Sequence, residues 1–195
     1  MSAETVNTLA AAGTFVVITV TAIAALIQLR HMRLSNQLQA LLELTDRWNG
    51  QSLQRSVTYV IQELPNKVSS PEYERSLRAT AFDYINHPEL ALCSWWEQVG
   101  SMVKFGLIPK DPLLDLAAEN VSAHWDALAL TVGIVRATRG PQTYINFEYL
   151  GHLGKKWMDE HPGGDYPSRA PRLPIPAHAR PLEAGTTTRN PGAAP

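Results

Sequence analysis

The distribution of hydrophobic and polar residues along this 195-residue chain changes at Arg30. Residues 9–29 are an apolar run without an ionisable side chain. As a helix, this run would rise about 31 Å, which matches the thickness of a bilayer's hydrocarbon core. Its three threonines are compatible with a membrane because their hydroxyls can bond back to helix carbonyls. The pattern predicts a transmembrane helix over residues 9–29, preceded by a short extracytoplasmic segment of residues 1–8.

Two alternatives compete with a membrane span at residues 9–29. A buried core helix of a soluble protein is one, but 21 residues without a charge are long for such a helix. A cleaved signal peptide is the other, and it requires basic residues before the apolar run. Residues 1–8 contain no Lys or Arg and one acid, Glu4. The sequence therefore favours a span that stays in the mature chain.

Basic residues follow the apolar run directly. Arg30, His31 and Arg33 lie after it, and all 17 Lys and Arg residues of the chain lie at or beyond Arg30. Under the positive-inside rule, Arg30 and Arg33 keep the C-terminal side in the cytoplasm. We expect a single-pass protein of the cell (inner or plasma) membrane, with its N-terminus outside and its C-terminal domain cytoplasmic.

Apolar residues at helical spacing continue past the span until Asn49 and Gly50 predict the end of the helix. The same stripe extends back into the membrane in alternating steps of three and four, with small residues at several positions. Two interpretations stay open: the stripe forms a parallel homodimer, or its cytosolic part packs on the chain's own later helices. The residues predicted for this helix–helix stripe include Gly13, Ala24, Leu34, Leu38 and Leu41.

Residues 30–161 show the spacing of amphipathic helices and no strand-like alternation of useful length. We therefore predict the all-α class, with the transmembrane helix continuing into a cytosolic bundle of about five or six helices. Ser70 and Pro71, for example, are typical of a helix start. The later helices are expected at residues 51–64, ended by Pro65, at 70–85, with Tyr73, Leu77, Ala81, Tyr84 and Ile85 as the apolar stripe, and at 90–103, 113–138 and 143–161.

The segment of residues 162–195 differs in composition from the helical region. It contains eight of the 14 prolines of the chain and almost no large apolar residue. Such a segment cannot bury enough surface to offset the entropy of ordering, so we predict a disordered tail. Residues 171–174 match a PxxP pattern, which one expects by composition in so proline-rich a segment.

Charge and cysteine content exclude several classes of protein. Residues 30–161 hold 13 basic and 15 acidic residues, and the whole chain has a formal net charge of -1. This balance gives no basic surface for nucleic acid, so no nucleic-acid partner is expected. The single cysteine, Cys93, excludes an intramolecular disulfide framework and is predicted to be a small buried hydrophobe.

The sequence contains few signs of chemistry. Phosphate-binding glycine loops, the GxSxG elbow and HExxH are absent. Glu148 and His152 are four residues apart on one helix face, but a single such pair is weak evidence for a metal. We predict no catalytic residue, no metal ligand and no cofactor, and leave the cofactor-binding residues unassigned. The one candidate polar site between helices would need five residues to converge, namely His124, Asp126, Arg136, Glu148 and His152.

Several stretches resemble an uncharacterised bacterial family of domains of unknown function. They are residues 28–30 (QLR), 43–48 (ELTDRW), 96–100 (WEQVG), 105–108 (FGLI) and 146–150 (NFEYL), together with the Trp125 helix and Arg136. The resemblance implies a small, single-span, membrane-anchored helical protein. It covers about two-thirds of the chain, leaves out the proline-rich tail and supplies no catalytic residue to carry over.

Two function classes follow. The first is a membrane-tethered helical interaction or scaffold module, without enzymatic activity, which uses the apolar stripe and aromatic grooves for contacts. Its expected partners are membrane lipid through residues 9–29, a second copy of the chain and an unidentified cytosolic protein. The alternative is a small-ligand sensor or enzyme with a site assembled between helices of the bundle. Whether the five polar side chains share a pocket distinguishes the two classes.

Overall fold

The computed structural model describes residues 2–79 and 83–174. These residues form helices and no strand, so the predicted all-α class is confirmed. The helices are α1 (Ala3–Trp48), α2 (Gln51–Gln62), α3 (Leu64–Lys67), α4 (Pro71–Ala79), α5 (Pro88–Lys104), α6 (Lys110–Arg139) and α7 (Ile145–Glu160).

The first helix, α1, is uninterrupted over 46 residues. As expected, the hydroxyls of Thr14, Thr19 and Thr21 donate to the carbonyl four residues earlier, at 2.8–2.9 Å. Residues 2–36 are exposed wherever their side chains are described. At the other end of α1, Leu44 belongs to the hydrophobic core of the bundle. One continuous helix therefore joins a fully exposed apolar segment to a packed domain.

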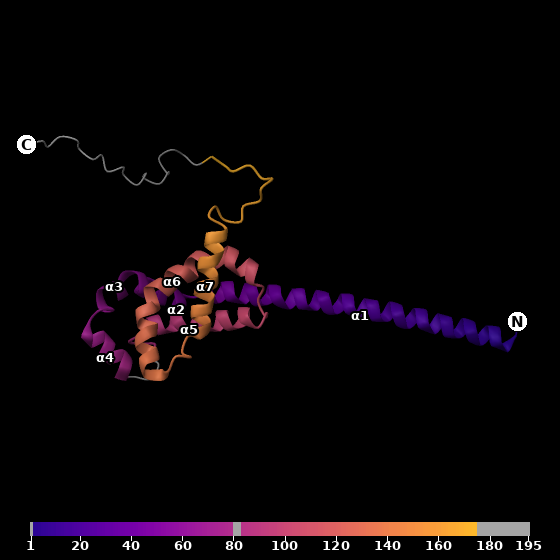
Figure 1. The fold of residues 1–195 in the computed structure, drawn as a ribbon, viewed down its shortest axis with the longest axis horizontal. Coiled ribbons are helices and arrows are strands. Elements are labelled where there is room, and N and C mark those ends of the chain that lie inside the picture. The colour runs from indigo at the N-terminus through magenta and orange to yellow at the C-terminus, as the bar shows by residue number, and fades with distance from the viewer. Residues whose placement is uncertain (1, 80–82, 175–195) are drawn as a thin grey trace, which may run out of the picture. The chain divides into compact units, whose positions relative to one another are not determined.

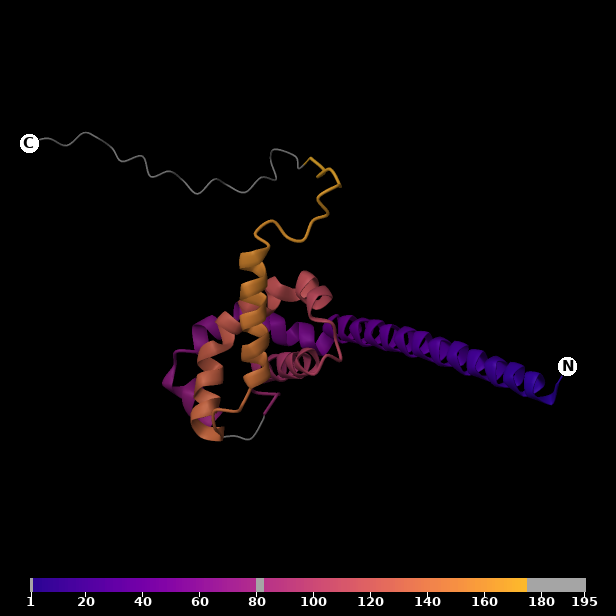
Figure 2. The same cartoon turned by 45° about the vertical axis from the view of Figure 1, so that its right-hand side comes forward.

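The centre of the bundle is formed by α5, α6 and α7. Figures 1 and 2 both show α7 lying against α6, and α7 also packs on α5. The fully buried Leu92, Leu128 and Phe147 come one from each of these three helices. The shorter α2 packs on α5, and α4 packs on α6. Burial of these apolar faces is the main favourable contribution to folding.

Most helix boundaries agree with the sequence pattern. The backbone N–H of Tyr73 donates to the Ser70 hydroxyl at 3.1 Å, so the predicted capping role of Ser70 is confirmed. The bounds of α5, α6 and α7 lie within three residues of those expected. Proline and glycine mark helix ends because of their backbone restrictions, and these signals are local.

The prediction of a helix over residues 70–85 is wrong at its end, because residues 83–85 are not helical. The structure ends α4 at Ala79, and the predicted stripe residue Ala81 lies outside the described residues. Tyr84 and Ile85 lie in a turn and are exposed. The carboxylate of Asp83 accepts the backbone N–H groups of residues 85 and 86, both at 3.1 Å. This local bonding competes with a helix.

The predicted end of the second helix also differs from the structure. The helix α2 ends at Gln62, and Pro65 lies in the first turn of α3 rather than after a helix. Proline is favoured at the start of a helix because its missing N–H has no intrahelical partner there. Residue 65 therefore starts a new turn, and Leu64 beside it is buried.

Residues Asp165–Pro195 form a unit separate from Met1–Gly164. In its described part, residues 165–174, turns are present but no helix or strand. The Tyr166 hydroxyl donates to the Pro171 carbonyl at 3.0 Å, and the Arg172 guanidinium lies 4.7 Å from the Tyr166 ring centroid. The predicted disordered tail lies largely in residues 175–195, outside the described residues.

Candidate functional site

The first of the five predicted polar residues, His124, lies inside the bundle. Its Nδ1 accepts a hydrogen bond from Trp96 Nε1 at 3.3 Å. The ring centroids of Trp48 and Trp96 lie 5.8 and 5.9 Å from that of His124. Burial lowers the pKa of His124 to about 4, so the ring is neutral at physiological pH. The histidine joins α6 to α5 within an aromatic cluster.

Arg136 and Glu148 are brought together by the structure. Arg136 Nη2 donates to Glu148 Oε2 at 2.7 Å, across the turn between α6 and α7. Arg136 also donates through Nε to the Thr143 carbonyl at 2.9 Å and through Nη2 to the Tyr144 carbonyl at 3.4 Å. These bonds hold the turn in which Tyr144 has a left-handed backbone, with φ of 58°. The guanidinium therefore stabilises the turn that connects α6 to α7.

The remaining two predicted residues lie elsewhere. Asp126 forms an ion pair with Lys155 on α7, and both side chains are exposed. His152 is also exposed. His124 and Asp126 are two residues apart on α6 and therefore point in different directions. Of the five residues, the described contacts join Arg136 with Glu148 and place the other three in separate surroundings.

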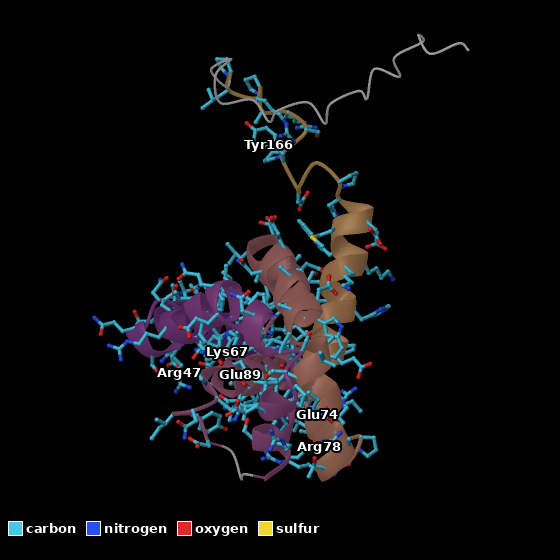
Figure 3. All side chains as sticks on the ribbon, turned by 90° about the vertical axis from the view of Figure 1, so that its left-hand side faces the viewer. Arg47, Lys67, Glu74, Arg78, Glu89 and Tyr166 are labelled. Atoms are coloured by element: carbon cyan, nitrogen blue, oxygen red, sulfur yellow. The ribbon has the colours of Figure 1, made fainter. Side chains whose placement is uncertain are left out.

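A polar cluster that the sequence analysis missed lies at the start of α5 (Figure 3 labels Glu89). Glu89 is fully buried, and its Oε1 accepts the Tyr73 hydroxyl at 2.9 Å and lies 2.8 Å from His87 Nδ1. The Tyr73 and Thr131 hydroxyls are 2.8 Å apart. Buried carboxylates are rare and need partners. This cluster links α4, α5 and α6.

The cluster around Glu89 is enclosed and only partly satisfied. Glu89 Oε2 has no hydrogen-bond partner among the described residues. Burial raises the pKa of the Tyr73 hydroxyl and, one turn further along α5, the pKa of the Cys93 thiol. Both groups therefore stay protonated, and Cys93 is the buried, unreactive residue that the sequence predicts. The arrangement fits a structural network better than a reactive site.

Glu97 forms a second contact that the sequence analysis missed. Its carboxylate accepts the backbone N–H groups of Asn146 and Phe147, each at 2.9 Å, and the Asn146 side-chain amide at 2.7 Å. The donors belong to the first turn of α7, whose N–H groups have no intrahelical partner. One turn beyond Glu97, Gly100 allows close approach, because a Cβ there would lie 2.1 Å from the Asn146 carbonyl oxygen. Together these residues fasten α7 to α5.

An apolar groove of about 200 Å³ lies between α1, α5 and α6. Three of the five tryptophans, Trp48, Trp95 and Trp96, line it. The groove is lined by Leu41, Leu44, Thr45, Trp48, Trp95, Trp96, Val99, Leu113, Leu116, Ala117 and Asn120.

Within the described part of the chain, no group of three His, Cys, Asp or Glu residues is placed to hold a metal ion.

The predicted helix–helix stripe divides into two parts. Gly13, Ala24, Leu34 and Leu38 are exposed, whereas Leu41 packs against the core of the bundle. Among the described residues, α1 is the one helix long and apolar enough to cross a membrane. The first four residues of the stripe are therefore exposed, and only its last residue, Leu41, packs on the bundle.

Comparison with known proteins gives one family. Residues 15–157 match the model of DUF4760, described as a domain of unknown function. The chain belongs to the DUF4760 family. No curated protein and no solved structure matches the chain. The match covers the greater part of α1 and the whole bundle up to α7, and leaves out the tail.

The DUF4760 match makes the contact of α5 with α7 informative. Glu97 and Gly100 lie in one of the stretches that resemble the family, and Asn146 and Phe147 lie in another. In the structure these two stretches bind each other. Two of the stretches that resemble the family therefore hold helices together, and the domain is a helical module of unknown role.

Proposed function

We propose that this DUF4760 protein is a single-pass membrane protein that holds a helical interaction module at the cytosolic surface. Residues 9–29 of α1 cross the membrane, the N-terminus lies outside and α2–α7 lie in the cytoplasm. The observation that carries the proposal is α1 itself, one helix whose first part is apolar and exposed while Leu44 near its end is buried in the bundle.

The exposure of residues 10–29 supports membrane insertion. Phe15, Val16 and Ile18, for example, are each more than half exposed. In water such a surface would be an aggregation hazard, whereas in a bilayer it is matched to its solvent. A core helix of a soluble protein would bury this surface, but Gln37 is the first side chain of α1 described as partly buried.

The orientation is argued from the charges at the ends of the span. Arg30 and Arg33 are exposed directly after it, and Glu4 is the one charged side chain before it. Basic residues close to a span are retained on the cytoplasmic side. The bundle, which follows the two arginines, is then cytoplasmic.

We further propose a second copy of the chain as the partner of α1. Leu34 and Leu38 project from the aqueous part of the helix and are exposed, and they continue the stripe of Gly13 and Ala24 within the span. Two copies anchored in one membrane present this stripe in the same direction and register, which favours a parallel pair. Because Leu41 packs on the bundle, the pairing surface ends near Leu38.

Extraction of membranes at alkaline pH tests the anchor. We expect the full chain to stay in the membrane pellet, and the double variant Val17→Arg, Val20→Arg to move to the supernatant. Each arginine near the centre of a span opposes insertion by about 2.5–3.5 kcal/mol. The matched control Leu116→Arg, Leu130→Arg places the same charges on exposed positions of α6 and should remain in the pellet. A wild-type chain in the supernatant contradicts the proposal.

A further inference from the structure

We propose that the connection between α5 and α6, residues 104–110, is a second membrane contact that binds an anionic lipid surface. This inference rests on the proposed function, because it requires α1 to span the membrane. The segment, called the α5–α6 loop below, reads Lys-Phe-Gly-Leu-Ile-Pro-Lys. It places two large apolar side chains between two lysines.

The two apolar side chains of the α5–α6 loop face solvent. Phe105 is 73% exposed and Leu107 is 60% exposed, which puts both among the exposed large hydrophobic residues of the bundle. Lys104 and Lys110 at the two ends are exposed as well. Apolar side chains that enter the lipid interface while basic neighbours meet the headgroups are typical of peripheral membrane contacts.

The backbone holds this exposed pair in a fixed conformation. The Leu107 N–H donates to the Met102 carbonyl at 2.9 Å, and the Gly106 N–H donates to the Val103 carbonyl at 3.0 Å. With Gly106 at φ of 67°, this is a Schellman motif. The next residue, Ile108, is buried in the core. The loop is held by hydrogen bonds to α5 before it and by the buried Ile108 after it. Phe105 and Leu107 are therefore exposed in a conformation that the fold specifies.

The α5–α6 loop is the first part of the bundle met on the way from the membrane. Residues 2–36 are exposed wherever described, and Gln37 is the first partly buried residue of α1. Gln37 Nε2 donates to the Gly106 carbonyl of the loop at 3.5 Å. Figures 1 and 2 both show the connection from α5 to α6 beside α1 where the helix leaves the bundle.

The distance to the membrane is within reach. Gln37 lies eight residues after Leu29, which is about 12 Å along a helix. The headgroup layer extends about 5–7 Å beyond the hydrocarbon core. An average helix tilt of about 20° brings one side of the bundle closer to the surface. The remaining gap of about 5 Å is comparable to the length of a phenylalanine side chain.

The charges near the α5–α6 loop favour anionic lipid. Lys104 and Lys110 add to Arg30 and Arg33 on the membrane-proximal part of α1, and the Asp111 carboxylate lies 3.5 Å from Lys110 Nζ. Basic groups near a membrane are attracted by its negative surface potential. A protein partner for the same patch would have to fit between the bundle and the membrane.

Fluorescence of environment-sensitive labels tests the loop directly. The full chain is reconstituted in phosphatidylcholine vesicles with and without phosphatidylglycerol, with a label on Leu107→Cys, on Val20→Cys in the span or on Ile85→Cys in the turn after α4. Cys93 is fully buried and stays unlabelled. We expect lipids brominated on their chains to quench the labels at positions 20 and 107, and to leave the label at position 85 unchanged.

Charge variants add a second readout to the same experiment. Replacing Lys104 and Lys110 by Gln should weaken quenching at position 107 in vesicles with phosphatidylglycerol, because each lost lysine lowers the equilibrium constant for loop binding by about fivefold. Quenching at position 20 should stay the same. Loss of the lipid dependence without loss of α1 insertion identifies the loop as the lipid-binding element.

The outcomes separate the loop from the anchor. Quenching at position 20 without quenching at position 107 overturns the loop contact and leaves the anchor standing. A label at position 107 that is shielded from aqueous iodide but not quenched by brominated lipid is covered by protein, which also overturns the inference. No quenching at position 20 contradicts the anchor and, with it, the loop.

Discussion

The exposed part of α1 and the bundle use apolar residues in opposite ways. In residues 10–29 apolar side chains surround the whole helix and are exposed, whereas in α5–α7 they lie on inward faces and Leu92, Leu128 and Phe147 are fully buried. Under the proposed function, the two regions lie in different solvents, lipid for residues 10–29 and water for the bundle. A helix that is apolar all round matches lipid, and an amphipathic helix needs neighbours.

Polar groups follow the same division. In α1 the hydroxyls of Thr14, Thr19 and Thr21 are satisfied by their own helix. In the bundle, the Glu97 carboxylate accepts hydrogen bonds from another helix, and one carboxylate oxygen of Glu89 does the same. The three threonines of α1 therefore need no neighbouring helix, whereas the carboxylates of the bundle depend on a particular neighbouring helix. The predictions below make the same change in both regions to test this comparison.

The largest effect is expected for an added methyl group at a glycine. Gly100→Ala places a Cβ against the Asn146 backbone and should lower the free energy of unfolding by about 3 kcal/mol or more. Gly13→Ala in α1 and Gly133→Ala in α6 meet no atom within 4 Å and should leave the bundle as stable as before, or slightly more so. The free energy of unfolding is measured by denaturing the full chain in detergent and following the near-UV circular dichroism of its tryptophans. Equal effects at positions 100 and 13 would refute the comparison.

The next effect concerns pH. The pKa of His124 is about 4 in the folded chain and about 6.5 when unfolded, so folding favours the neutral ring. This contribution is present above pH 6.5 and is lost as the pH falls toward 4, by about 3 kcal/mol in total. His124→Gln should flatten the pH dependence of unfolding over this range, while His31→Gln in the exposed part of α1 should not. If the pH dependence of unfolding is the same in His124→Gln as in the unmodified chain, burial of this ring is not the cause of that dependence.

A smaller effect is expected for a carboxylate. Glu97→Gln removes charge from hydrogen bonds to the first turn of α7 and should cost about 2 kcal/mol. Glu43 on α1 is exposed and its carboxylate accepts from Gln39 at 3.3 Å, so Glu43→Gln should cost less than about 0.5 kcal/mol. The same denaturation measurement compares the two variants. Comparable losses would mean that the contact with α7 contributes little.

The smallest effect is expected for the apolar stripe of α1. Leu34→Ala should weaken the proposed homodimer by roughly 1 kcal/mol, because only part of a side chain is lost from each copy. Oxidative crosslinking of Leu34→Cys in membranes reports the pairing. Met32→Cys, on the opposite face of the exposed helix, is the matched control. Equal crosslinking at the two positions is incompatible with pairing through this stripe.

Local patterns in the sequence predict much of the fold. The apolar run, the capping Ser70 and the starts and ends of α5–α7 depend on residues within a few positions of one another. The predicted end of this helix at Ile85 is wrong because the apolar stripe looks continuous through Ile85. The turn at Asp83 competes with a helix there. Boundaries set by such side-chain bonding are less visible than those set by proline and glycine.

The candidate site could be predicted far less well. Glu89 follows Pro88 in what looks like an exposed first helical turn, and its burial depends on Tyr73 and Thr131, which lie far away in the sequence. The predicted polar set required helices to be rotated so that His124 and His152 met, and no local pattern specifies such rotation. Contacts between helices depend on how their surfaces interdigitate.

The most direct test of the membrane anchor is a labelling experiment in intact cells that express the full chain. A membrane-impermeant maleimide is applied to Ser2→Cys and to Ile85→Cys, since both positions are exposed and the native Cys93 is fully buried. We predict that Ser2→Cys reacts in intact cells and that Ile85→Cys reacts only after the membrane is permeabilised. Reaction of Ile85→Cys in intact cells, or of neither variant before permeabilisation, would contradict a single span with an outer N-terminus and a cytosolic bundle.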